Sequence, residues 1–196
     1  MRSVEKLQNL IPLGYLFLVV MGILKESVFF YQLKINILKY STIMDILISP
    51  IADLTANPII LICLVLFGII IALLLIFFYK YRNKNWVKKI FDANGDIIAL
   101  SNEEAKNKLG KIFILALSFG VLIFFLGLGV GGGHKIAKKI QTNKLEYKQK
   151  ITFNTGETEN IYLIDANSAY YFYVTQKSKS IKIAPIGAIK NIELPN

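Results

Sequence analysis

The feature that most constrains this chain is an uninterrupted apolar run at residues 58–79, PIILICLVLFGIIIALLLIFFY, which contains no charged side chain. A helix of this length extends roughly 33 Å at about 1.5 Å per residue, enough to cross the hydrocarbon layer of a bilayer, which is about 30 Å thick. Pro58 suits a first helical position, and aromatic and basic residues follow the run. The run therefore predicts a transmembrane helix.

Two other apolar segments predict further spans. Residues 112–130 form one, and its helix is expected to begin near Asn102, outside the membrane, because Ser101 and Glu104 fit the capping-box pattern. Residues 7–24 form the other if Lys25 reaches to the interface, whereas a longer version ending at Leu33 would place an ion pair inside the layer. A removable signal peptide is disfavoured because no small-x-small cleavage site follows.

The connection at residues 34–57 is amphipathic, with Lys39, Asp45 and Asp53 among isoleucine and leucine. It predicts a segment that lies along the membrane interface or enters it as a re-entrant piece. Between the second and third spans, residues 80–111 predict a hairpin turn at Asn94 and Gly95, followed by the start of the third helix.

From residue 145 onward the apolar pattern changes from helical to alternating, and β-branched and aromatic residues become frequent. The predicted strands cover residues 145–153, 160–165, 169–175, 180–184 and 189–194. Their number and short turns resemble the spacing of an SH3-like or Sm-like small barrel, with an open five-stranded antiparallel sheet as the alternative. The expected fold class is α+β: a transmembrane region (1–133), a basic linker (134–144) and a small β domain (145–196).

The net charge of +10 is concentrated beside the apolar spans. Segments 80–91 and 134–144 together carry nine basic residues and no acid, and nearly all of the basic residues in the chain are lysines. A nucleic-acid-binding surface would place its excess charge on a soluble face with arginines among the lysines, so nucleic acid is not an expected partner. The predicted membrane-interface basic residues are Lys80, Arg82, Lys84, Lys88, Lys89, Lys135, Lys138 and Lys139.

Five glycines end the third apolar segment: Gly127, Gly129, Gly131, Gly132 and Gly133. Their spacing matches a dinucleotide fingerprint by letter, but such a fingerprint follows a strand and opens a helix, whereas this run closes one. Two interpretations stay open, a flexible exit from the membrane and a small-residue surface for helix packing or oligomerisation.

Other candidate chemistry is weak. Residues 92–103 place oxygen ligands at several EF-hand positions, but Ile97 occupies the position where glycine is required. His134 is the only histidine, with no metal ligands at suitable spacing, and the single cysteine, Cys63, lies in the middle of the second span. The sequence therefore predicts no catalytic residue, cofactor or metal site, and a protein that is not an enzyme.

The expected function is that of a non-enzymatic, membrane-anchored interaction or regulatory module. Its expected partners are the lipid bilayer, possible anionic lipids, and a protein that binds the β domain or a second copy of the chain. The alternative is an oligomeric, membrane-perturbing or channel-forming effector with the β domain as sensor. The chain is expected to be a multi-pass protein of the plasma or inner membrane of a bacterium. Counts of lysine and arginine near the span ends favour an inside N-terminus with the β domain outside.

Overall fold

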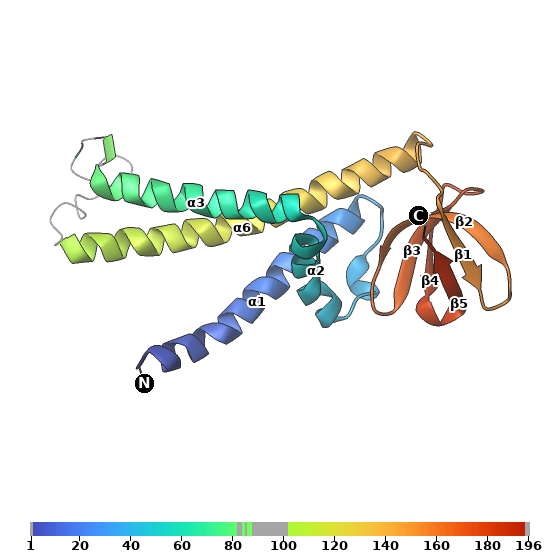
Figure 1. The fold of residues 1–196 in the computed structure, drawn as a ribbon, viewed down its shortest axis with the longest axis horizontal. Coiled ribbons are helices and arrows are strands. Elements are labelled where there is room, and N and C mark those ends of the chain that lie inside the picture. Colours follow the sequence, from blue (N-terminus) through green and yellow to red (C-terminus); the bar gives the residue numbers. More distant parts are fainter. Residues whose placement is uncertain (1, 82–83, 85, 88–101, 195–196) are drawn as a thin grey trace. The chain divides into compact units, whose positions relative to one another are not determined.

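The structure is a computed structural model that describes residues 2–81, 84, 86–87 and 102–194. It combines α-helices with a five-stranded antiparallel sheet at the C-terminal end of the chain (Figure 1). The chain divides into two compact units, which are described separately. The first contains residues 1–52 and 125–196, and the second contains residues 53–124.

Three helices are long and apolar enough to cross a membrane. They are α1 (Arg2–Tyr31), α3 (Pro58–Lys80) and α6 (Asn102–Gln141). Their most apolar stretches cover Ile11–Tyr31, Pro58–Lys80 and Lys106–Gln141. The three predicted spans lie within these helices, and the helices extend further because polar residues at the ends of α1 and α6 remain helical.

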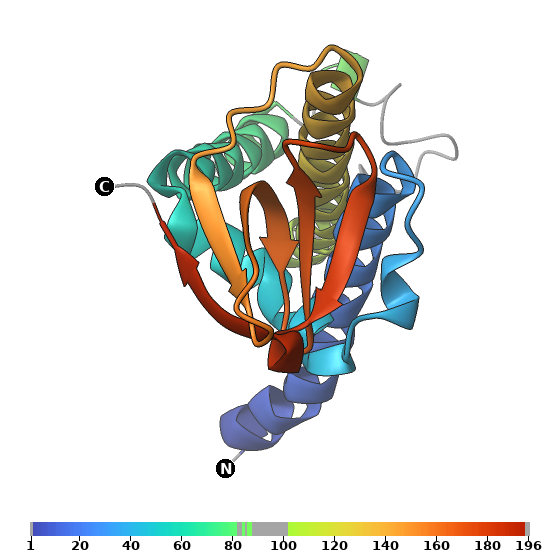
Figure 2. The same ribbon diagram turned by 90° about the vertical axis from the view of Figure 1, so that its right-hand side faces the viewer.

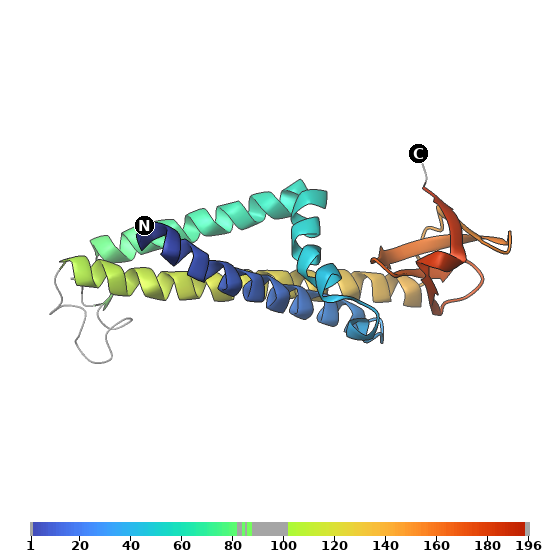
Figure 3. The same ribbon diagram turned by 90° about the horizontal axis from the view of Figure 1, so that it is seen from below.

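In the first unit, the C-terminal turns of α1 contact α6 at Gly129, Gly132 and Gly133 (Figure 3). After α1 the chain forms a short 3-10 helix, η1 (Ile37–Lys39), and then α2 (Ile43–Ala56). α2 has 14 residues, so it is roughly 21 Å long and shorter than the hydrocarbon layer. η1 and α2 therefore form most of the amphipathic connection at residues 34–57.

The sheet belongs to the first unit as well. Its strands are β1 (Gln149–Phe153), β2 (Thr158–Ala166), β3 (Tyr170–Thr175), β4 (Ile181–Pro185) and β5 (Ile189–Glu193), and a 3-10 turn, η2 (Ile186–Ala188), joins the last two. The strand order is β4-β3-β2-β1-β5, with every neighbouring pair antiparallel (Figure 2). The alternative of a five-stranded antiparallel sheet is confirmed, whereas the prediction of an SH3-like or Sm-like small barrel is wrong, because the sheet does not close. Its edges are β4 and β5, so no ladder joins the first and last strands in the order.

Both faces of the sheet carry apolar residues. Consecutive residues of β3 are aromatic or aliphatic, and alternate residues of a strand point to opposite faces. On one face Ile151, Ile161 and Tyr173 are buried together. On the other face Phe172 is buried against Phe30, which lies on α1. The sheet therefore has one core of its own and a second core that it shares with the helices.

In the second unit, α3 and the N-terminal part of α6 make a close contact at Gly120. A side-chain carbon at this position would come within 2.4 Å of the Phe67 ring. No residue of α3 is buried, which is typical of a helix whose apolar surface faces lipid. Beyond its C-terminal end an aromatic cluster forms, in which Trp86 lies 5.9 Å from the ring of Phe77.

Candidate functional site

The contact between the sheet and the helices of the first unit combines aromatic packing with side-chain hydrogen bonds. Its centre is the pair Phe30 and Phe172, whose ring centroids are 4.9 Å apart. Tyr40, which follows η1, packs edge-on against Tyr170 at 5.5 Å and Phe172 at 6.1 Å. Leu33 and Ile37 complete the buried core of this junction.

The turn between β2 and β3 adds a set of hydrogen bonds to this aromatic contact. The Asn167 side-chain oxygen accepts the backbone N–H groups of Ala169 and Tyr170 at 3.0 and 2.8 Å, which fixes the amide group. Its Nδ2 then donates to the carbonyl oxygen of Tyr40 at 3.1 Å and to the Ser41 hydroxyl at 3.2 Å. The turn is therefore held directly to the segment that precedes α2.

Asp45 makes the second polar connection. Its carboxylate accepts the Ser168 backbone N–H and the Ser168 hydroxyl, both at 3.0 Å. The same carboxylate accepts the backbone N–H of Thr42 at 2.8 Å and the Thr42 hydroxyl at 2.7 Å, while the Thr42 hydroxyl accepts the Asp45 N–H. This reciprocal arrangement is a capping box at the start of α2, so one carboxylate both caps a helix and binds the sheet. We refer to Asn167, Ser168, Tyr40, Ser41 and Asp45 as the latch.

The hydrogen bonds of the latch determine the charge state of Asp45. Burial by itself raises the pKa of the Asp45 carboxyl, but hydrogen bonds from Thr42 and Ser168 outweigh it, so the pKa lies below its ordinary value of 3.8. The carboxylate is therefore ionised at neutral pH, when it accepts all four hydrogen bonds.

A second polar group lies on α1, within its apolar stretch. The Lys25 ammonium donates to Glu26 at 2.7 Å and to the Ser49 hydroxyl of α2 at 3.0 Å, and Ser49 in turn donates to Glu26. The side chains of Lys25 and Glu26 are 15% and 10% exposed. Ion pairs at such positions are costly unless each charge finds a partner, and Ser49 supplies one to both charges. This pair is therefore compatible with the helix that contains it.

The five glycines lie inside α6, with one side of the run against α1. A side-chain carbon on Gly129 would come within 2.4 Å of the Lys25 carbonyl oxygen, and one on Gly133 within 2.5 Å of the Phe29 carbonyl oxygen. Gly132 faces the Phe29 ring, whereas Gly127 and Gly131 meet nothing within 4 Å. Gln32 adds a hydrogen bond from its side-chain nitrogen to the carbonyl oxygen of Val130 at 2.7 Å.

The predicted basic residues fall in three places. Lys135, Lys138 and Lys139 lie on the last turns of α6, next to apolar residues of that helix that pack against the junction core. Lys80 ends α3 and lies over the Tyr81 ring at 5.9 Å, and Lys84 is exposed. Arg82, Lys88 and Lys89 lie outside the described residues, as do the predicted hairpin, Ser101 and most of the EF-hand-like segment.

His134 is exposed on α6. Among the described residues, no three His, Cys, Asp or Glu side chains are grouped in a way that would hold a metal ion. Cys63 is exposed on α3.

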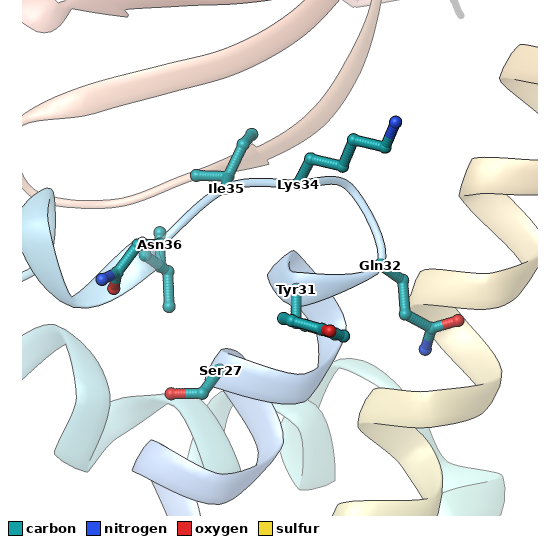
Figure 4. Close-up of a pocket in the computed structure, with 7 residues that line it drawn as sticks. Ser27, Tyr31, Gln32, Lys34, Ile35 and Asn36 are labelled. Carbon is teal, nitrogen blue, oxygen red and sulfur yellow. The ribbon is translucent and has the colours of Figure 1, made fainter.

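A groove of about 670 Å³ lies beside the C-terminal end of α1 (Figure 4). It is lined by Ser27, Tyr31, Gln32, Lys34, Ile35, Asn36 and Ile37. Smaller hollows of about 340 and 270 Å³ lie on the sheet, the first beside the turn between β1 and β2 and the second beside the end of β3.

Comparison with known proteins found no family model, no curated protein and no solved structure that matches this chain.

The latch and the Lys25–Glu26–Ser49 group were not predicted from the sequence. A local signal existed for one half of the latch, since Thr42 and Asp45 have capping-box spacing. No local signal could indicate the other half, because Asp45 and Ser168 are 123 residues apart in the chain.

Proposed function

We propose that this protein is a membrane-anchored interaction module, in which three apolar helices hold the C-terminal sheet at the bilayer surface for a protein partner. The observation that carries this proposal is the latch together with the Phe30–Phe172 contact. One face of the sheet is engaged by the helical part of its own unit, so the module has a fixed rather than a loosely tethered sheet.

The arrangement agrees with three crossings of the membrane. Between the C-terminal end of α1 and that of α6 the chain would cross the membrane twice, through α3 and then α6, so both ends lie on the same side. The sheet contacts the chain at both of these ends. The exposed apolar residues of α1, α3 and α6 have a ready explanation in lipid contact, since soluble proteins rarely expose continuous surfaces of this kind. A multi-pass location in a bacterial plasma or inner membrane is part of the proposal.

The partner surface that we propose is the β5 edge of the sheet. β5 is last in the strand order, so its outer backbone groups have no neighbouring strand among the described residues, and edges of this kind accept an added strand from a partner. Leu194 follows β5 and is 68% exposed, which provides an apolar contact at the end of this edge.

The test compares detergent-solubilised full-length protein with a Leu194→Asp variant in cross-linking and affinity capture. Leu38→Asp serves as the matched control, because Leu38 is an exposed leucine outside the sheet. Specific partners should be lost with Leu194→Asp and with removal of residues 145–196, but retained with Leu38→Asp. Identical partner sets from all four proteins would contradict the proposal. Dye release from vesicles containing the protein would favour the channel-forming alternative instead.

A further inference from the structure

The groove beside the end of α1 is a site distinct from the proposed partner edge of the sheet. It lies where the apolar stretch Ile11–Tyr31 ends and the polar connection to η1 begins. We propose that this groove binds the headgroup of an anionic phospholipid, with the lipid's acyl chains lying along α1.

The lining of the groove has the two-part chemistry that such a ligand needs. Tyr31, Ile35 and Ile37 supply an apolar wall, and Tyr31 is 80% exposed. Ser27, Lys34 and Asn36 supply a hydroxyl, an ammonium and an amide, and none of the described residues that line the groove is acidic. Aromatic residues with a polar tip and lysines are the side chains that favour the membrane interface.

One polar atom in the lining lacks a partner. The Ser27 hydroxyl oxygen is buried, and no described residue offers it a hydrogen bond. In Figure 4, Ser27 and Asn36 extend to the same side of α1, while the Lys34 side chain extends from the loop in a different direction. A buried hydroxyl without a partner costs free energy, and a small rearrangement of the groove around a phosphate or glycerol oxygen would remove that cost.

The local charge favours an anion. Lys34 lines the groove, and residues 134–144 contain four lysines and no acid. The junction core brings the chain around Lys34 and residues 134–144 together, because Ile136 and Ile140 pack against the cluster that contains Phe30, Leu33 and Ile37. A group of lysines next to a span attracts anionic lipid.

The C-terminal end of a helix normally carries partial negative charge, which would oppose an anion here. At α1 two of the terminal carbonyl groups are already occupied. Phe30 accepts hydrogen bonds from the N–H groups of Leu33 and Ile35, and Tyr31 accepts one from Lys34. Lys34 itself has a φ of 61°, an unusual value for a lysine, at the point where the chain turns over the groove.

A phospholipid and free inorganic phosphate share the same anionic group, so the test must separate them. Native mass spectrometry of the full chain, released from a nonionic detergent, would be carried out with phosphatidylglycerol, phosphatidylcholine or inorganic phosphate. We expect one phosphatidylglycerol to be retained at higher occupancy than phosphatidylcholine, with no retention of inorganic phosphate.

Three substitutions test whether the lipid binds in this groove. Lys34→Gln should lower the affinity for the first phosphatidylglycerol about five-fold, and Ser27→Ala should also lower it, while Lys39→Gln, which removes an exposed lysine outside the lining, should leave it unchanged. Equal retention of the two lipids, retention of phosphate alone, or equal effects of Lys34→Gln and Lys39→Gln would each overturn the proposal. Thermal unfolding of each variant verifies that the loss of lipid does not come from loss of fold.

Discussion

Asp45 at the start of α2 accepts two hydrogen bonds from Ser168, one from its backbone and one from its hydroxyl, both at 3.0 Å. Since the same carboxylate caps α2 through Thr42, any change at Asp45 affects both the helix and its contact with the sheet. Ser168 and Asp45 can therefore be changed separately to test the latch from the sheet and from the helix.

Substitution of Ser168 by alanine should weaken the contact between the sheet and α2 without changing the cap of α2. The lost hydroxyl removes one hydrogen bond to a charged acceptor, worth about 1.5 to 3 kcal/mol before solvent exposure reduces it. Hydrogen exchange should become faster at residues 40–46 and at the turn around residues 166–169. Ser180→Ala, an exposed serine in the turn between β3 and β4, should leave exchange at residues 40–46 unchanged.

The latch should also open at low pH. The pKa of Asp45 is lowered in the folded protein, so this group stabilises the contact above its ordinary pKa of 3.8, and the stabilisation disappears as the pH falls through the lowered value. The protection of residues 40–46 from exchange, corrected for the intrinsic pH dependence of amide exchange, should therefore stay constant between about pH 5 and 8 and decrease in the acid range. An Asp45→Asn variant should lack this acid-dependent step, and a step of the same size in that variant would contradict the assignment to Asp45.

The glycines of α6 provide a matched pair of substitutions. A methyl group on Gly129 would come within 2.4 Å of the Lys25 carbonyl oxygen, and α1 would have to move away from α6. At Gly131 the same methyl group meets nothing within 4 Å, so alanine there should be neutral or stabilise the helix by up to about 1 kcal/mol. The unfolding temperature in detergent should fall for Gly129→Ala and should not fall for Gly131→Ala. Equal unfolding temperatures would show that α1 and α6 are not in close contact here.

Breaking the Lys25–Glu26 ion pair on α1 should destabilise the protein more than replacing both of its residues. Glu26→Leu removes the carboxylate that accepts a hydrogen bond from the mostly buried Lys25 ammonium, which should cost about 3 to 5 kcal/mol. Replacement of both residues by leucine should recover most of this loss, because no unpaired charge remains. Unfolding by denaturant in detergent measures both values, and a double variant less stable than Glu26→Leu alone would contradict the account.

Local patterns in the sequence were sufficient for most elements of this fold. The apolar runs lie within α1, α3 and α6, and the alternation in residues 145–196 indicated all five strands to within a few residues at most ends. The exception is the first strand, expected from residue 145 and observed from Gln149. In the structure the apolar residues of β3 divide between the two faces of the sheet, with Tyr170 and Phe172 on one and Tyr171 and Tyr173 on the other.

What the sequence could not supply is the set of contacts between distant segments. The helical path through Lys25 and Glu26 depends on Ser49, which lies on another helix. The burial of Phe172 depends on Phe30, and nothing in the neighbourhood of either residue identifies the other. The closure into a barrel could not be decided from strand count and turn length, because closure depends on the pairing between the two end strands.

The central claim is that the sheet is docked on the chain around Tyr40 to Asp45 while the protein is in the membrane. Cysteine cross-linking in isolated membranes tests it most directly, with Cys63→Ala, Ser41→Cys and Asn167→Cys combined in the full chain. The structure places the Asn167 and Ser41 side chains in hydrogen-bond contact at 3.2 Å, so mild oxidation should cross-link this pair in the membrane pellet. A control pair, Ser41→Cys with Ser178→Cys, uses the turn at the other end of β3 and should not cross-link. Equal yields for the two pairs, or recovery of the protein in the soluble fraction, would contradict the account.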